Sequence, residues 1–202
     1  DDASTAFLAW TTTPWTLPAN TGLTVNADLD YVAIKTADSN INYVLAASRV
    51  ARYFGEDPSV YEVVWTKKGS ELVGQRYTPV LEIKKPEGDA YRVVAGEHVT
   101  DTDGTGIVHT APAFGEEDFQ MHQKHLLPVL MTVDAEGRFD EEMGAFAGLA
   151  INEAHGPVIE ALKAADRLFK KESITHSVAT CWRCKTRLMF KAQPAWYIDV
   201  NK

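Results

Sequence analysis

The chain has 202 residues, 45% hydrophobic and 24% charged, a balance typical of a folded domain with a sizeable core. Its net charge of −8 argues against a protein that coats nucleic acid over its whole surface. No apolar run approaches the roughly 20 residues that span a bilayer, and the start lacks the basic and apolar regions of a signal peptide. We therefore expect a cytoplasmic protein with no membrane partner.

Short strands separated by turn residues are predicted over most of the first 110 positions. β-branched and aromatic residues are concentrated in the segments 7–11, 30–36, 41–47, 61–66, 78–83, 91–99 and 104–110. A short helix is expected over 47–55. So many closely spaced strands favour an α+β fold, with a β-barrel-like core of short strands and flanking helices, over a βαβ array.

Two further helices are expected in the second half of the chain. The segment 115–127 has three carboxylates in its first turn, which suits the positive end of a helix dipole. The segment 152–172 has an apolar stripe made of Val158, Leu162, Ala165 and Phe169. Between these helices, 129–139 has the pattern of a hairpin.

The stretch WTTTPWTLPAN at residues 10–20 is the first candidate site. Its prolines remove ladder donors and end the strand that threonine and tryptophan favour. The hydroxyl groups around this break belong to Thr11, Thr12, Thr13 and Thr16. Together they can hold ribose hydroxyls, a carbonyl oxygen or a water; the alternative is that they only cap loose backbone. If the backbone stays extended, Thr12 points to the opposite side from its neighbours.

The stretch GTGIVHTAPAFGEEDF at residues 104–119 is the second candidate. It predicts a strand that ends near His109, a Gly/Pro-rich loop, and a helix with Asp118 in its first turn. A strand, loop and helix in this order commonly line a pocket. The alternative is a structural histidine and an acid that only caps the helix.

A metal site is a weaker alternative for the same region. Asp118, His122 and His125 fall on one helix face, and His109 could complete the set. The zinc-protease pattern HExxH is absent, however, and surface helices often carry such residues. We therefore expect no metal at this site.

The stretch CWRC contains both cysteines, Cys181 and Cys184, which are too few and too close for a secreted disulfide framework. One CxxC pair supplies half of the four ligands that a structural zinc requires, and His176 could add one more. We expect half of a zinc knuckle whose partner cysteines lie outside this chain.

Taken together, the two long motifs resemble the editing insert, connective polypeptide 1 (CP1), of isoleucyl-tRNA synthetases. They occur in the family's order, about ninety residues apart, and the likeness continues through HSVATCWRCKTRLMFKAQPAWYI. The related valyl and leucyl domains typically carry TTRP where this chain has TTTP. The resemblance implies an editing domain over 1–175 and a segment over 176–202 that returns to a catalytic domain outside this chain.

This resemblance implies hydrolysis of the ester that joins a misattached valine to tRNA(Ile), extending to misactivated valyl-adenylate, with no cofactor for editing. The activation signatures HIGH and KMSKS are absent, so ATP binding would belong to the rest of the polypeptide. The implied partners of this monomer are the tRNA 3′ end and the remaining synthetase. The alternative is a non-catalytic docking module for the tRNA acceptor stem, using the segment 163–202 with its net charge of +6.

The family's site residues can be matched to positions of this chain. Asp118 would hold the α-ammonium group of the misattached amino acid, and a one-place error in the match would give this role to Glu117. His109 would line the side-chain pocket and exclude isoleucine, with a general base as its alternative role. The hydroxyls of the family's threonine motif would bind the terminal ribose and the ester and position water. The matching residues are Thr11, Thr13 and Thr16, with Thr12 in the same substrate-binding run and Trp15 as a pocket wall.

Overall fold

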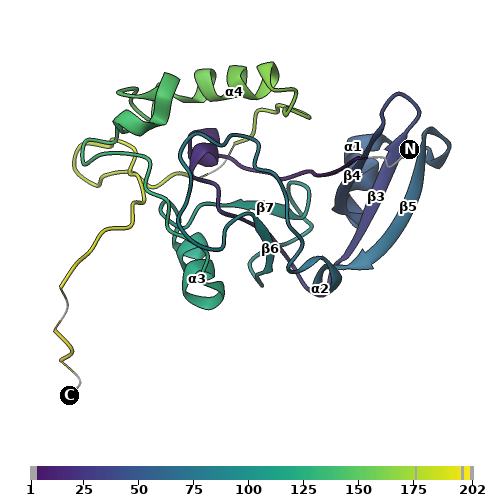
Figure 1. Ribbon diagram of the computed structural model, residues 1–202, viewed down its shortest axis with the longest axis horizontal. Helices are drawn as coiled ribbons and strands as arrows, with labels where there is room; N and C mark the ends of the chain where they lie inside the picture. Colours follow the sequence, from purple (N-terminus) through teal and green to yellow (C-terminus); the bar gives the residue numbers. More distant parts are fainter. Residues whose placement is uncertain (1–3, 176, 197, 201–202) are drawn as a thin grey trace.

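The computed structural model describes residues 4–175, 177–196 and 198–200 (Figure 1). Its described strands form two small sheets, one of four strands in the order β1-β4-β3-β5 and one of three in the order β6-β2-β7. Several helices accompany them, so the predicted α+β class is confirmed. The barrel-like core needs correction, because no closed barrel forms among the described strands: the sheets remain separate and share a core instead.

The four-stranded sheet is built from the β-branched and aromatic segments of the first 70 residues. Its strands are β1 (Ser4–Phe7), β3 (Asp30–Thr36), β4 (Ile41–Ala46) and β5 (Tyr61–Lys68). β3 pairs antiparallel with both β4 and β5, whereas β1 runs parallel to β4. The antiparallel pairing of β3 with β4 follows from the short turn that joins them.

The three-stranded sheet contains the strand that belongs to the second motif, residues 104–119. Its strands are β2 (Gly22–Val25), β6 (Arg92–Ala95) and β7 (Ile107–Thr110). β2 is buried along its whole length in the middle, parallel to β6 and antiparallel to β7. This register places His109 opposite Leu23 at the end of the sheet from which the second motif continues.

The two sheets are joined by the chain segment that precedes the threonine motif. The Leu8 N–H donates to the Val44 carbonyl of one sheet, and the Trp10 N–H donates to the Ile107 carbonyl of the other. A common core fills the space between the sheets and includes Leu23, Val25, Tyr31, Ala33, Val44, Ala46, Val93 and Ile107. The threonine motif is therefore held against β7 by backbone hydrogen bonds.

Gly106, just before β7, allows the chain to pass close to Ala46 at the end of β4. Its φ of +76° lies in the left-handed region, and a Cβ there would lie 2.4 Å from the Cβ of Ala46. The Tyr31 hydroxyl, fully buried, donates to the Gly106 carbonyl at 2.7 Å. A glycine is thus required by both backbone conformation and space.

Helical segments cover the sheets and carry part of the site. The α-helices are α1 (Val50–Phe54), α2 (Gly69–Leu72), α3 (Glu116–His125) and α4 (His155–Ala164). Short 3₁₀ helices span Pro14–Ala19, Ala47–Arg49, Pro58–Val60 and Glu141–Phe146. In Figure 1, α3 and α4 lie on opposite sides of the three-stranded sheet.

The last predicted helix is shorter than expected. Val158 and Leu162 are buried as the stripe predicts, but α4 ends at Ala164. Asp166 then adopts a left-handed φ of +53°, and the Arg167 N–H donates back to the Leu162 carbonyl, the pattern of a Schellman cap. The prediction that Phe169 continues the stripe is therefore wrong. Its ring packs instead on an aromatic group of Tyr43, Tyr53 and Phe54 beside the four-stranded sheet.

Two other predictions outside the sheets can be compared with the structure. The segment 78–83 forms no regular strand, although its sequence favours one. The hairpin over 129–139 is confirmed as a tight turn, with a bridge between Val133 and Phe139. Beyond 175, the described chain has one β-bridge, between Thr180 and Arg187. Met189 packs against the large hydrophobic cluster and the Ala192 N–H donates to the Ala113 carbonyl, after which the chain runs away from the rest of the molecule (Figure 1, yellow). No helix among the described residues has the length and apolarity needed to cross a membrane.

Candidate functional site

A cleft of about 780 Å³ lies between the two sheets and the segment 166–174 that follows α4, which we call the strap. Its walls include the segments 5–12, 75–78 and 166–174, together with His109 and the inner side of α4. Thr11, Thr12 and His109 are the sequence-predicted site residues that line it. The structure thus brings the threonine motif and the β7 histidine to one concave surface.

The threonine motif ends its extended run in a hydrogen-bonded turn. Pro14 begins the 3₁₀ helix Pro14–Ala19, a first position where proline's missing N–H costs nothing. The Thr16 hydroxyl donates to the Thr13 carbonyl at 2.8 Å, and the Thr13 N–H donates to Thr11 Oγ1 at 3.0 Å. Because the chain bends here, Thr12 lines the cleft beside Thr11, and the alternation expected of an extended run does not hold.

Trp15 lies on the core side of this turn. Its ring packs edge-on against Phe114 with 5.0 Å between ring centroids, and it borders the large hydrophobic cluster under α4. Trp15 is not among the residues that line the cleft. Its contact instead ties the threonine turn to the loop between β7 and α3.

His109 is buried, with 5% of its surface exposed, and each of its ring nitrogens has a polar partner. Nε2 lies 3.1 Å from the Thr16 hydroxyl, and Nδ1 lies 2.8 Å from Nδ2 of Asn20. Asn20 Nδ2 also donates to the Gly22 carbonyl at 2.8 Å, and Asn20 Oδ1 accepts from the Tyr77 hydroxyl at 2.6 Å. These contacts orient the amide and leave Nδ1 as an acceptor. The imidazole proton is therefore on Nε2 and points at Thr16.

Asn20 and Tyr77 are site residues that the sequence reasoning missed. Asn20 is the last residue of the first motif, and a polar residue that closes a Pro-rich buried run was the available signal. Tyr77 lies 57 positions from Asn20 in a segment with no motif, so no sequence signal marked it. Both residues line the cleft.

Burial holds His109 neutral and makes the stability of the fold depend on pH. Loss of hydration lowers the pKa of His109 from 6.5 to about 4, only partly offset by the contact with Thr16. The unfolded chain therefore binds a proton between these pH values that the folded chain does not. The free energy of unfolding therefore has its full contribution from neutral His109 above pH 6.5. It falls by about 3 kcal/mol as the pH falls to about 4, because protonation favours the unfolded chain over this range.

Urea unfolding at a series of pH values checks this expectation. The wild-type chain should lose more unfolding free energy between pH 7 and pH 4 than His109→Gln, which cannot titrate in this range. The difference isolates His109 from the carboxylates that both chains share. Equal pH dependence in the two chains would contradict the buried neutral imidazole.

Asp118 lies at the start of α3, close to the end of β7 and outside the lining of the cleft. Its Oδ2 accepts a hydrogen bond of 2.9 Å from the N–H of Ala111, and Ala111 is two residues after His109 in the chain. Burial raises the pKa of the Asp118 carboxyl, while the Ala111 bond and the charge of His98 act in the opposite direction. The helix thus holds a partly desolvated carboxylate beside the strand that carries His109.

The histidines of the metal alternative are directed to other partners. His122 Nδ1 lies 2.7 Å from the Leu127 carbonyl, and His125 Nε2 lies 2.7 Å from the Ala95 carbonyl. Within the described part of the chain, no group of three or more His, Cys, Asp or Glu side chains is placed to hold a metal ion. The side chains of Asp118, His122 and His125 therefore do not point toward one common position.

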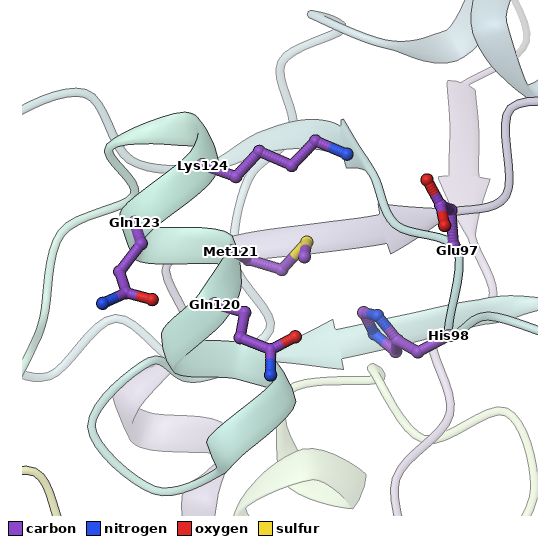
Figure 2. A pocket seen from close by; sticks show the side chains of 6 residues that line it. All are labelled: Glu97, His98, Gln120, Met121, Gln123 and Lys124. Atoms are coloured by element: carbon purple, nitrogen blue, oxygen red, sulfur yellow. The ribbon is translucent and has the colours of Figure 1, made fainter.

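A second hollow, of about 410 Å³, lies between α3 and the loop after β6 (Figure 2). Gln120 and His98 point toward one another across it, and Met121 and Lys124 lie on the same helix. The buried His98 Nε2 has no hydrogen-bond partner among the described residues. None of the sequence-predicted site residues lines this hollow.

Comparison with solved structures defines the class of fold. The crystal structure of GlLeuRS-CP1 matches with a TM-score of 0.67 and 13% identity, covering 86% of this chain and 87% of that one. The P. falciparum cytosolic leucyl-tRNA synthetase editing domain matches with a TM-score of 0.50 and 16% identity, over 61% of this chain and 48% of that one. No protein-family model matches. The fold is that of the CP1 editing domains of class I synthetases.

Sequence relatives identify the particular enzyme family. The isoleucine–tRNA ligases of Treponema denticola, Clostridium kluyveri and Thermoplasma volcanium are 42%, 44% and 43% identical over 99%, 96% and 98% of this chain. The matched segments are 20%, 18% and 19% of those proteins, so the chain spans about a fifth of the length of these relatives. The chain is homologous to one segment of the isoleucine–tRNA ligases, as the sequence resemblance predicts.

Proposed function

We propose that this chain is the editing domain of an isoleucyl-tRNA synthetase and hydrolyses the ester of valyl-tRNA(Ile), together with misactivated valyl-adenylate. The observation that carries the proposal is the buried, neutral His109 on the wall of the cleft, hydrogen-bonded to the threonine motif. This motif faces the cleft through Thr11 and Thr12. A site with this arrangement offers hydroxyl groups to a ribose ester and a fixed imidazole to a side chain.

Such a second site has a clear physical purpose. One methylene in an apolar pocket is worth only about 1–3 kcal/mol, a limit for which isoleucine against valine is the standard worked case. A synthetic site therefore accepts valine too often for accurate translation. A second pocket that admits valine but excludes isoleucine restores the accuracy by hydrolysing the wrong product.

In the proposed mechanism, His109 sets the size of the pocket and does not act as the general base. Both of its nitrogens are engaged, and a pKa of about 4 makes the ring a poor proton acceptor at neutral pH. Asp118 does not line the cleft but is held beside the end of β7, near His109, and from there it would bind the α-ammonium group through a charge-assisted contact. Water held by the hydroxyls of Thr11, Thr13 and Thr16 would attack the ester carbon, and the bond from that carbon to the ribose oxygen would break. The substrate's neighbouring ribose hydroxyl would pass the water's proton to the leaving ribose oxygen, which releases valine and the free tRNA 3′ end, with orientation supplying much of the acceleration.

We propose the tRNA 3′ end as the partner that enters the cleft. Five basic side chains line it, and the two acidic ones, Asp166 and Glu172, both belong to the strap. Glu172 is already paired with Lys170 and Arg52, so part of this negative charge is neutralised. The basic lining residues are Arg76, Arg167, Lys170, Lys171 and Arg187. Their excess of positive charge suits a phosphate backbone.

The exposed C-terminal segment suits contact with the rest of the synthetase. Trp182 is 77% exposed, and Trp196, Ile198 and Val200 are each more than 80% exposed. Exposed apolar side chains in one segment mark a surface for another protein part. We propose that the remaining synthetase covers them.

Cys181 and Cys184 fit half of a structural zinc site. They lie on one tight turn, where the Lys185 N–H donates to the Cys181 carbonyl. Hydrogen bonding with the side chain and backbone of Thr186 lowers the pKa of the exposed Cys184 thiol to about 7, which favours the thiolate that binds zinc. We propose that these two thiols hold zinc together with ligands from outside the chain, where the metal would serve only to fix the segment.

The test of the proposed function is hydrolysis of valyl-tRNA(Ile) by the full-length enzyme. We expect release of valine and not of isoleucine, at a rate that a chelator does not change. Hydrolysis that stops in chelator would favour the metal alternative. Tight tRNA binding without hydrolysis would overturn the proposal in favour of a docking module.

A further inference from the structure

We propose that Tyr77 is a positioning residue for this site: its hydroxyl orients the Asn20 amide, which in turn holds His109 in one tautomer. The inference rests on the proposed function, in which His109 sets the size of the pocket. It concerns a residue that reaches the site from the segment between α2 and β6.

Tyr77 is fixed in place before it meets Asn20. Its N–H donates to the Tyr91 carbonyl at 3.1 Å, and the two rings pack edge-on with 6.1 Å between centroids. Burial raises the pKa of the Tyr77 phenol, so its hydroxyl stays protonated and can donate. That donated bond, 2.6 Å long, goes to Asn20 Oδ1.

The Asn20 amide passes this orientation to the imidazole. With Oδ1 occupied by Tyr77, Nδ2 is directed to the Gly22 carbonyl and to Nδ1 of His109, both at 2.8 Å. An amide donor on Nδ1 requires that the imidazole proton be on Nε2, facing Thr16 at 3.1 Å. The path of directed hydrogen bonds therefore runs from Tyr77 to the threonine motif.

This path gives the pocket wall a fixed shape. A ring held at both nitrogens cannot rotate without breaking a buried hydrogen bond. Removing the Tyr77 hydroxyl leaves Asn20 Oδ1 without its donor and frees the amide to turn. His109 would then exchange between tautomers and lose its fixed orientation, and discrimination by size would weaken.

The experiment uses Tyr77→Phe, which keeps the ring and removes only the donor. Long-range ¹H–¹⁵N NMR of the labelled chain, with the ring signals assigned through His109→Gln, reports which nitrogen of His109 is protonated. We expect a single Nε2–H tautomer in the wild type and a mixture in Tyr77→Phe. In the full-length enzyme, the ratio of valyl- to isoleucyl-tRNA hydrolysis should fall about three- to tenfold, the equivalent of one neutral hydrogen bond.

The matched control is Tyr91→Phe, which removes the hydroxyl of the other ring in the same pair. No hydrogen bond of that hydroxyl is found among the described residues, and both the tautomer and the hydrolysis ratio should stay at wild-type values. The NMR measurement is made without substrate. If the only role of Tyr77 were to contact the substrate, Tyr77→Phe would therefore leave the tautomer of His109 unchanged. An unchanged tautomer in Tyr77→Phe, or a changed tautomer with an unchanged ratio, overturns the inference.

The wild-type spectrum supplies a test that does not depend on how the variant folds. An Nδ1–H tautomer of His109 in the wild-type chain overturns the inference outright. If the wild-type enzyme hydrolyses no valyl-tRNA, the proposed function fails, and the hydrolysis arm of the inference fails with it. The NMR arm then still decides whether Tyr77 sets the tautomer of His109.

Discussion

Replacing Asp118 by asparagine is expected to slow valyl-tRNA hydrolysis by about thirtyfold or more while leaving the fold intact. Removing one member of a desolvated charge pair costs about 2–5 kcal/mol, and each 1.4 kcal/mol is a factor of ten. Asparagine keeps an oxygen that can accept the Ala111 N–H, so the start of α3 should remain in place. The measurement is single-turnover deacylation by the full-length enzyme, with thermal unfolding as the check on folding.

Glu117→Gln is the matched control for Asp118→Asn. It makes the same chemical change on the neighbouring residue, which is exposed at the surface of the same helix turn. We expect near wild-type turnover from Glu117→Gln. Reversed results would show that the family motif is matched one position too far along, and normal turnover in both would remove the ammonium contact from the mechanism.

The activity should also respond to acid through Asp118. Because burial raises the pKa of this carboxyl, the wild-type rate should begin to fall at a higher pH than an ordinary aspartate would cause. Protonation removes the negative charge that binds the ammonium group. This acid limb should be absent from the residual activity of Asp118→Asn.

Replacing His109 by alanine is the second change with a large expected effect. Loss of the imidazole enlarges the pocket, so isoleucyl-tRNA(Ile) should become a substrate and the preference for valine should fall about ten- to a hundredfold. That range corresponds to the 1–3 kcal/mol that one methylene contributes in an apolar site. Rates for valyl- and isoleucyl-tRNA(Ile), measured on one enzyme preparation, give the ratio directly.

Using a ratio protects this test from the instability of the variant. The substitution leaves Asn20 Nδ2 without the ring nitrogen to which it donates, so part of the preparation can unfold. Unfolding lowers both rates equally and leaves their ratio unchanged. If His109→Ala loses hydrolysis of both esters while folded, the imidazole takes part in the chemistry; an unchanged preference would remove His109 as the size gate.

Much of the local structure was predictable because the interactions that form it are close in sequence. The strands β3, β4 and β5 lie where β-branched and aromatic residues predict them, and a short turn with Asp38, Ser39 and Asn40 separates β3 from β4. The carboxylates in the first turn likewise marked the start of α3. The threonine motif and His109 were both recognised, and both line the cleft.

The errors arise where distant parts of the chain decide the outcome. The segment 78–83 has the composition of a strand, but its apolar side chains Val80, Leu81 and Ile83 pack against the cluster under α4 instead of joining a sheet. The helix predicted over 152–172 ends early because Asp166 adopts a left-handed cap, which releases Phe169 to the aromatic group beside the other sheet. Neither contact can be predicted from secondary-structure propensity or from hydrophobic periodicity, because both depend on residues distant in the sequence.

By itself the sequence determined which chemical groups are present: a run of hydroxyls ended by prolines, a histidine at a strand end, and a carboxylate at a helix start. Only the tertiary structure decided how they act together. The proton of His109 is placed by Asn20, 89 positions away, and Asn20 is oriented by Tyr77, a further 57 positions from it. A hydrogen bond has a direction, and that direction is set by partners that only folding brings within 3 Å of each other.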